Sequence, residues 1–199
     1  MKEAKLMSQF VHPNILQMLG VCFSQTQQPW LIMEFMEGGD LLNFLRNSRP
    51  NKNIAFSKLT MDDMLGICID IAKGCEYLER HCFVHRDLAA RNCLVTTIAD
   101  GDEIRRIVKI ADFGLARGLY RQEYHRKNHI KLPVRWMAPE SVVDGVFTSQ
   151  SDVWSFGIIM YEVMVLGEQP YAGMSNDEVI NYIRQGGILS QPTGCPFEM

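Results

Sequence analysis

Two short polar motifs constrain this sequence more than any other feature. The first spans residues 85–92, where Asp87 is followed five residues later by Asn92. The second is Asp112-Phe113-Gly114, and its Asp112 lies 25 residues after Asp87. Carboxylate and amide oxygens are the ligands that Mg²⁺ prefers in proteins. We therefore expect the two motifs to meet in one site that holds a metal ion beside a reacting hydroxyl.

A third motif, Ala138-Pro139-Glu140, follows downstream, and the three together resemble the protein-kinase family. A polar turn after a helix would explain the first motif alone, but not all three in this order. The resemblance implies that Asp87 accepts the proton of the substrate hydroxyl. It also implies that Asn92 and Asp112 bind Mg²⁺, with Mn²⁺ as an alternative, and that ATP is the phosphoryl donor.

The class of substrate is indicated by residues on both sides of the second motif. Serine/threonine kinases usually carry a Lys where this chain has Ala89, and Arg91, four residues after Asp87, resembles protein-tyrosine kinases. Residues 132–136 resemble the platform that supports a long tyrosine ring. The resemblance therefore implies protein substrates with tyrosine acceptors, and it adds Arg91 to Asp87 and Asn92 as a catalytic residue.

Other segments narrow the resemblance to one branch of the receptor tyrosine kinases. These segments are residues 36–41, 74–79 and 151–157. They are most similar to the Ros/sevenless and anaplastic lymphoma kinase branch of the insulin-receptor superfamily. The likeness runs over essentially the whole chain.

The segment after the second motif resembles the activation loop of that superfamily. The resemblance implies regulatory phosphorylation of Tyr120 and Tyr124. His125 stands in place of a third loop tyrosine, Gly118 replaces a usual Asp, and residues 126–132 are one residue shorter than in the family. These departures concern regulation rather than the chemistry.

The resemblance also assigns residues that would contact the nucleotide. Met33 falls at the gatekeeper position, Glu34 and Met36 fall where the hinge backbone meets adenine, and Leu94 would pack beneath the adenine ring. Glu3 matches the helix residue that pairs with the ATP-orienting Lys. The alternative for the first four is the core or edge of a strand, and for Glu3 it is a solvated charge on a helix.

Further residues receive structural or regulatory roles from the same resemblance. The positions that stack to couple the two lobes are Met7, Met18, His85, Phe113 and Asp152. We expect His85 to be structural and not a general base. Arg86 would pair with a phosphorylated tyrosine, and Glu140 would form a salt bridge with an Arg beyond residue 199.

Composition excludes several other classes of protein. The 199 residues are 47% hydrophobic and 22% charged with a net charge of −3, which indicates a globular chain and gives no reason to expect nucleic-acid binding. Cys68, Cys75 and Cys82 recur every seven residues, and we interpret them as small buried residues of one helix. No signal-peptide pattern opens the chain, and the apolar stretch 153–166 contains Glu162, so it predicts a core helix and no membrane span.

Periodicity and turn signals predict an α+β fold, mostly helical with a few short strands. Capping boxes mark two helix starts, at Thr60 with Asp63 and at Ser175 with Glu178. Helices are expected before Pro13, after Asp40, from Thr60 to about Arg80, over about 151–166, and after Ser175. Strands are expected at 16–24, 30–35, 93–96 and 107–110.

The resemblance implies part of a kinase domain, with residues 1–35 as the remainder of the N-terminal lobe and 36–199 as the hinge and C-terminal lobe. The glycine-rich loop and strand Lys of the family are not in the sequence. We therefore expect a fragment without useful kinase activity by itself, in which Met7, Met18 and Met33 face a missing sheet and leave apolar surface exposed.

Two other functions are weighed against the kinase. One is a non-catalytic kinase-like module that binds partners, and the other, disfavoured by the peptide platform, is a small-molecule phosphotransferase. The resemblance further implies receptor signalling, with the parent protein in the plasma membrane and this segment in the cytoplasm. Its expected partners are phosphotyrosine-binding adaptors and a second copy in a homodimer of the full receptor.

Overall fold

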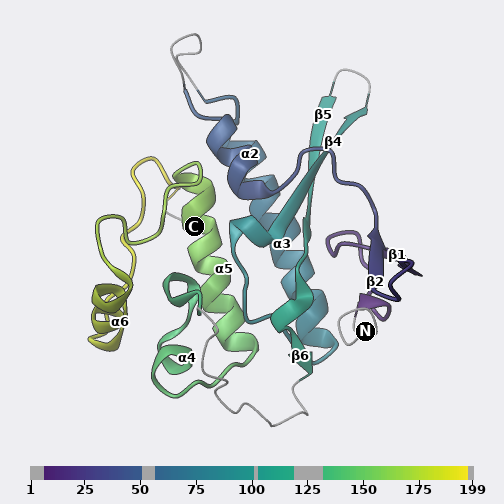
Figure 1. The fold of residues 1–199 in the computed structure, drawn as a ribbon. Coiled ribbons are helices and arrows are strands. Elements are labelled where there is room, and N and C mark those ends of the chain that lie inside the picture. The colour runs from purple at the N-terminus through teal and green to yellow at the C-terminus, as the bar shows by residue number, and fades with distance from the viewer. Residues whose placement is uncertain (1–6, 51–56, 101–102, 119–131, 197–199) are drawn as a thin grey trace.

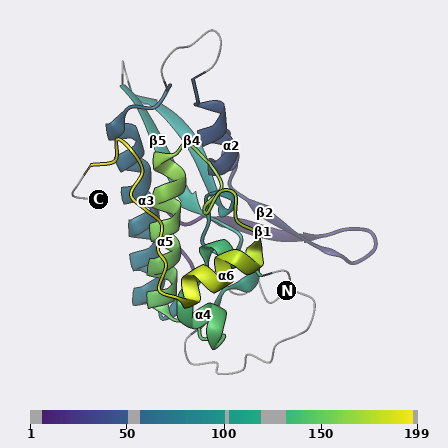
Figure 2. The same ribbon diagram turned by 90° about the vertical axis from the view of Figure 1, so that its left-hand side faces the viewer.

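The computed structural model describes residues 7–50, 57–100, 103–118 and 132–196. Two long helices, α3 and α5, lie side by side, with smaller helices and short sheets around them (Figures 1 and 2). The helices of the described residues are α2 (Leu41–Asn47), α3 (Met61–Arg80), α4 (Pro139–Val143), α5 (Ser149–Met164) and α6 (Asn176–Arg184), with single 3₁₀ turns η1 (Ala90–Asn92), η2 (Phe113–Leu115) and η3 (Val134–Trp136). Their antiparallel two-stranded sheets pair β1 (Met18–Phe23) with β2 (Pro29–Met33), β3 (Phe83–Val84) with β6 (Arg117–Gly118), and β4 (Cys93–Asp100) with β5 (Glu103–Ile110). The predicted mixture of helices and a few strands is confirmed.

Helix α3 begins and ends where the sequence predicts. The Thr60 N–H donates to Asp63 Oδ2 (2.9 Å), and the Asp63 N–H donates to Thr60 Oγ1 (3.2 Å), which completes the capping box. Ile67, Ile71 and Leu78 are buried in the main core at helical spacing. This stripe packs α3 against α5 and the β4–β5 hairpin.

The three evenly spaced cysteines do not share one helix, so that part of the prediction is wrong. Cys68 and Cys75 lie on α3, but Cys82 lies past its end, where a φ of 58° turns the chain into β3. Burial raises the pKa of the Cys68 thiol to about 12. Within the described residues, no group of three or more His, Cys, Asp or Glu side chains could hold a metal ion. Cys68 lies in the main core and Cys75 packs against it, as small apolar side chains do.

The β4–β5 hairpin is longer than predicted. Val95 and Val108 pair across the two strands and are buried, as the apolar pattern indicates. The pairing continues outward through Ile98 opposite Arg105, where Ile98 is exposed. Because the outer half has no core beneath it, its sequence shows no apolar alternation that would predict a strand.

The β1–β2 hairpin projects from the body (Figure 2), and it corrects one prediction about exposed methionines. Met7 is only 1% exposed and lies in the main core, while Met18 and Met33 are partly buried against that core. The exposed apolar side chains belong to other hairpin residues, such as Phe23 and Trp30. The helix predicted before Pro13 lies mainly outside the described residues.

Helix α5 begins earlier than predicted. Its N-cap is Thr148, whose N–H donates to Ser151 Oγ (3.0 Å) while the Ser151 N–H donates to Thr148 Oγ1 (3.4 Å). A serine in place of an acidic residue hid this capping box from the sequence pattern. The box predicted at Ser175 and Glu178 is confirmed as the start of α6.

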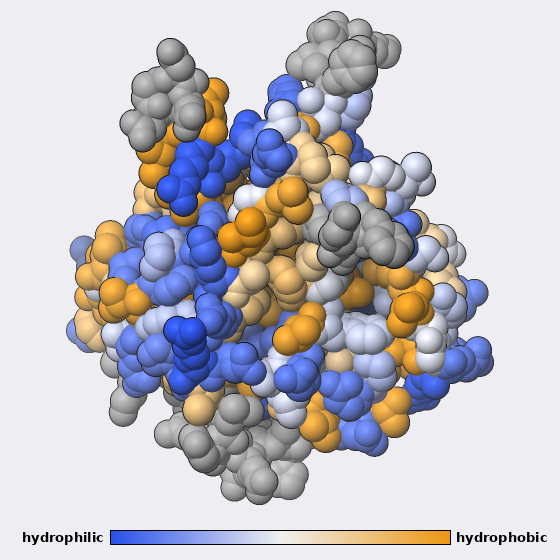
Figure 3. Space-filling model, turned by 180° about the vertical axis from the view of Figure 1, so that it is seen from behind, coloured by the Kyte–Doolittle hydropathy of each residue, from blue (hydrophilic) through white to orange (hydrophobic). Residues whose placement is uncertain are grey.

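The face seen from behind carries hydrophobic residues among hydrophilic ones (Figure 3). A cavity of about 360 Å³ lies between α5 and the segment that follows α6, and its walls include Met160, Met164 and Leu189. None of the expected catalytic or nucleotide-contacting residues lines this cavity. In the described part of the chain, no helix has the length and apolarity that crossing a membrane requires.

Candidate active site

The loop that carries Asp87 is fixed by a carboxylate on α5. Asp152 Oδ2 accepts from the His85 N–H (2.6 Å), and its Oδ1 accepts from the Arg86 N–H (3.0 Å). Arg86 has a φ of 72°, in the left-handed region, so the chain turns sharply there. Burial raises the pKa of Asp152 to about 6, and the two N–H bonds act in the opposite direction. Asp152 therefore lies where the sequence reading expects a coupling residue.

His85 is fully buried and structural, as predicted. Its Nε2 lies 3.0 Å from the Ala111 carbonyl oxygen, and its Nδ1 can accept from the Asp87 N–H (3.4 Å). Burial lowers the pKa of His85 to about 4, so the ring is neutral near pH 7 and Nε2 is the donor. The ring also packs edge-on against Phe113, with 5.0 Å between centroids. A buried ring with these bonds cannot serve as a solvent-linked base.

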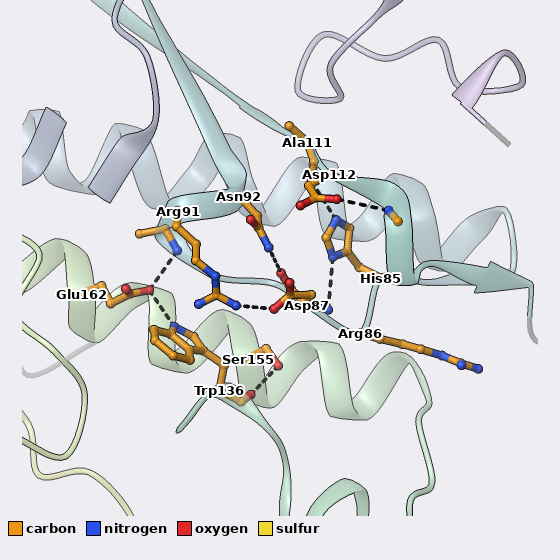
Figure 4. A network of polar contacts seen from close by, with 12 residues as sticks. His85, Arg86, Asp87, Arg91, Asn92, Ala111, Asp112, Trp136, Ser155 and Glu162 are labelled. Carbon is orange, nitrogen blue, oxygen red and sulfur yellow. Dashed lines mark hydrogen bonds and ion pairs between the residues drawn. The ribbon is translucent and has the colours of Figure 1, made fainter. Parts of the chain in front are cut away.

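Asp87, Arg91 and Asn92 converge at the start of β4 (Figure 4). The Asp87 carboxylate forms an ion pair with the Arg91 guanidinium. Asn92 Nδ2 donates to the Asp87 backbone oxygen (2.7 Å), which leaves the amide oxygen Oδ1 as the end available to a cation. Burial raises the pKa of Asp87, and the charge of Arg91 opposes that rise. Arg91 therefore holds the carboxylate in place, while 18% of the Asp87 side chain remains exposed.

Asp112 and Phe113 point in opposite directions. Phe113 is 1% exposed and packs against Phe10, with 5.1 Å between ring centroids. Asp112 is exposed, has a φ of 56°, and accepts from the Gly114 N–H through Oδ1 (3.3 Å). The left-handed backbone at Asp112 separates the two side chains.

The two expected metal ligands lie next to each other. The Ala111 N–H donates to the Asn92 backbone oxygen (2.8 Å), so the residue before Asp112 is bonded to Asn92 itself. An amide oxygen and an exposed carboxylate form an all-oxygen donor set, which fits Mg²⁺. Asn92 and Asp112 therefore fit the expected metal, and phosphate oxygens could complete its coordination.

Three residues expected near adenine lie together beside this donor set. Leu16, Met36 and Ala111 form a small buried cluster, and Met33 and Leu94 pack against it. Since Ala111 precedes Asp112, this apolar surface adjoins the expected metal ligands.

Glu34 lies at the same segment, but its side chain is engaged elsewhere. Both carboxylate oxygens accept from Lys109 Nζ, each at 2.7 Å, and Oε1 also accepts from the Gln17 N–H (2.7 Å). Any contact of Glu34 with adenine is therefore left to its backbone, as the sequence reading expects.

Trp136, from the segment that resembles the acceptor platform, and Glu162, expected only in a core helix, join this network. The Arg91 guanidinium lies 4.4 Å from the ring centroid of Trp136, and Trp136 Nε1 donates to Glu162 Oε2 (2.9 Å). Glu162 Oε2 also accepts from the Ala90 N–H (2.9 Å). The one signal for Glu162 was its position as a lone acidic residue in the apolar stretch 153–166. That signal indicates a buried charge but not its partners.

The remaining regulatory residues are placed only in part. Glu3, Tyr120 and Tyr124 lie outside the described residues. The Arg86 guanidinium lies 5.2 Å from the ring centroid of Phe147. Glu140 lies in the first turn of α4, and its backbone oxygen accepts from the Asp144 N–H (2.9 Å).

Comparison with known proteins shows the family of this chain. Residues 1–199 match the family described as protein tyrosine and serine/threonine kinase. The chain is 56% identical over 200 residues to the tyrosine-protein kinase transforming protein ros of UR2 avian sarcoma virus, and 55% identical over 200 residues to the proto-oncogene tyrosine-protein kinase ROS of Gallus gallus. It is 53% identical over 202 residues to the protein sevenless of Drosophila virilis. Each match covers 100% of this chain, which spans 49% of the viral protein and 8% of each of the other two.

Those matches extend over the catalytic loop, the segment at Asp112 and the platform alike. The predicted likeness to the Ros/sevenless branch is confirmed. The chain belongs to the protein tyrosine and serine/threonine kinase family, with the ROS and sevenless receptor tyrosine kinases among its close relatives.

Proposed function

We propose that this chain carries the hinge and catalytic lobe of an ATP-dependent protein-tyrosine kinase that acts in receptor signalling. The observation that carries the proposal is the convergence of Asp87, Arg91 and Asn92 on one loop, with Asp112 beside them. Phosphoryl transfer depends mainly on alignment and charge neutralisation, and these side chains can provide both.

Each of these residues has a distinct role in the proposed reaction. Asp87 orients the tyrosine hydroxyl and accepts its proton, and Arg91 holds the Asp87 carboxylate in position. Asn92 and Asp112 would hold Mg²⁺, or Mn²⁺ in its place. The metal, when bound, neutralises charge on the phosphates of ATP.

The nucleotide base would rest on the apolar surface beside the metal ligands. Met36 and Leu94 would contact adenine, Met33 would limit the depth of the site, and Glu34 would contribute its backbone. Support comes from the shared cluster around Ala111, which places this surface next to Asp112.

The domain boundaries and partners belong to the same proposal. Residues 1–35 would be part of the N-terminal lobe and residues 36–199 the hinge and C-terminal lobe. Tyrosine-containing proteins would be substrates, and phosphotyrosine-binding adaptors and a second receptor copy would be partners, at the cytoplasmic side of the plasma membrane. The similarity to ROS and sevenless supports this assignment.

Regulation would depend on residues outside the catalytic loop. We propose that phosphorylated Tyr120 and Tyr124 pair with Arg86, that Glu3 pairs with an ATP-orienting lysine, and that Glu140 forms a structural salt bridge. Phe113 and Asp152 would couple the catalytic loop to the core, which is supported by their contacts with His85.

The test uses two proteins. The first consists of residues 1–199. The second is an extended form, in which the residues that precede the matching segment in the Gallus gallus relative are joined to residue 1. In whichever form transfers phosphate, we expect Asp87→Asn to lower kcat by roughly 100-fold to 10,000-fold with little change in ATP affinity. Asp62→Asn, at an exposed position of α3, is the matched control.

Steady-state kinetics and ATP binding provide the readouts. Turnover of Asp87→Asn within a few-fold of the Asp62→Asn control would contradict the role of Asp87. Transfer by neither form, with ATP still bound, would favour the non-catalytic module instead.

A further inference from the structure

Helix α5 holds Trp136 at two points. Ser155 Oγ donates to the Trp136 backbone oxygen (2.6 Å), and Glu162 Oε2 accepts from Trp136 Nε1 (2.9 Å). Ser155 and Glu162 are seven residues apart, which is close to two helical turns, so they lie on one face of α5. Both the backbone and the ring of Trp136 are therefore fixed from the same helix.

The same oxygen of Glu162 also binds the catalytic loop. Oε2 accepts from the Ala90 N–H at 2.9 Å, and Glu162 is only 1% exposed. Ala90 lies 72 residues before Glu162, and Trp136 lies 26 residues before it. One buried oxygen thus joins the loop that carries Asp87 to the segment that resembles the acceptor platform.

Arg91 connects Trp136 to Asp87. The Arg91 guanidinium lies over the indole ring, 4.4 Å from its centroid, and forms the ion pair with Asp87 (Figure 4). Arg91 follows Ala90 directly in the sequence. A shift of Glu162 would therefore reach Asp87 by two routes, through the loop backbone and through the indole ring.

We propose that Glu162 is a positioning residue that sets the distance between the Asp87 carboxylate and the tyrosine platform at Trp136. The proposal rests on the proposed function and deepens it, because it names what aligns base and acceptor. Burying a carboxylate is unfavourable unless its bonds are satisfied. Here one bond joins the N–H of Ala90 in the catalytic loop and the other joins the indole N–H of Trp136 in the platform.

Glu162→Ala removes both bonds, whereas Glu162→Gln can keep both, because one amide oxygen can replace Oε2. We expect the Ala variant to lose roughly tenfold or more in kcat/KM for a tyrosine peptide, with KM for ATP unchanged. The Gln variant should stay within about threefold of wild type by the same reasoning. Glu168→Gln, at an exposed position just after α5, is the matched control.

A purely structural role predicts a different pattern. Loss of a purely structural residue would reduce the concentration of folded protein and leave the kinetic constants per folded molecule unchanged. All rates are therefore normalised to the concentration of folded protein. Equal constants for Glu162→Ala and the control would overturn the proposal. Trp136→Phe keeps the ring beneath Arg91 but removes the N–H donor, so we expect Glu162→Ala to have a smaller effect in that background. Full additivity of the two changes would also overturn the proposal.

A binding measurement separates this proposal from the proposed function. Residues 1–199 are titrated with an unreactive peptide in which a phenylalanine replaces the acceptor tyrosine. If neither form of the protein transfers phosphate, the proposed kinase activity is contradicted. The role of Glu162 is then tested by the peptide dissociation constants alone. Weaker binding by Glu162→Ala than by Glu162→Gln would support a positioning role at the platform. Identical dissociation constants would refute it.

Discussion

Two buried carboxylates on α5 show how single residues hold the catalytic loop. Asp152 binds the N–H groups of His85 and Arg86, and Glu162 binds the N–H of Ala90. Each carboxylate is 6% exposed or less, and its charge is compensated by N–H donors from the loop. The loop therefore has its conformation fixed at both ends before any nucleotide binds.

His85 should make stability depend on pH. Burial lowers its pKa from 6.5 to about 4 in the folded chain, while the unfolded chain keeps the ordinary value. Between these values the unfolded state binds more protons, so the contribution of His85 to stability rises from pH 4 to pH 6.5 and is lost as pH falls. A shift of this size corresponds to on the order of 3 kcal/mol.

The measurement is the free energy of unfolding across that window, for wild type and His85→Gln, without added metal or nucleotide. Glutamine does not titrate, so the difference between the two curves isolates His85. We expect wild type to lose more stability than the variant as pH falls. Parallel curves would show that His85 is not buried as a neutral ring.

At the scale of the element, α3 contains two glycines with opposite surroundings. A Cβ at Gly74 would lie 2.8 Å from Ile110 Cδ1 and 2.9 Å from the Asn14 backbone oxygen, whereas one at Gly66 would meet nothing within 4 Å. We expect Gly74→Ala to lower stability by about 1–3 kcal/mol through overpacking. Gly66→Ala should raise it by up to about 1 kcal/mol through helix propensity.

Denaturant unfolding of the two variants provides the comparison. Since both changes add one methyl group to the same helix, any shared effect on propensity cancels. Equal effects of the two substitutions would mean that α3 does not approach Asn14 and β5 as closely as the structure shows.

The sequence predicted those elements whose signals are local. The capping box at Thr60 and the N-cap at Asp40 depend on neighbours within a few residues, and both helix starts are confirmed. Helix α4 and the strands β3 and β6 were not predicted, because two to five residues give too little periodicity. The partners of Glu162 lie 26 and 72 residues away, so no local pattern could identify them.

In the candidate site, too, local features could be predicted from the sequence and long-range contacts could not. Asp87, Asn92 and Asp112 could be predicted because they belong to short motifs, and the structure brings them together. The side-chain bond between Glu34 and Lys109 was not found, because the two residues are 75 positions apart. Residues in one contiguous motif can be predicted from the sequence. The contacts that hold those residues from distant segments can be identified only from the folded structure.

At the scale of the whole molecule, the site is assembled from segments that the two central helices hold. Helix α5 contributes Asp152 and Glu162 to the catalytic loop, and α3 packs beneath the β4–β5 hairpin that carries Leu94. The buried cluster of Leu16, Met36 and Ala111 adjoins Asp112, because Ala111 directly precedes it in the sequence. In the proposed function, this arrangement would place the adenine-contacting residues beside the metal ligands and the acceptor platform.

The central claim is that this arrangement directs phosphate from ATP to tyrosine. Its most direct test is the transfer of labelled γ-phosphate to two peptides that differ only in a tyrosine or serine acceptor, by the extended form with Mg²⁺. We expect label on the tyrosine peptide alone, loss of transfer when Mg²⁺ is chelated, and a decrease of roughly 100-fold or more in Asp112→Asn. Equal labelling of both peptides, or transfer that persists without the metal and without Asp112, would contradict the account.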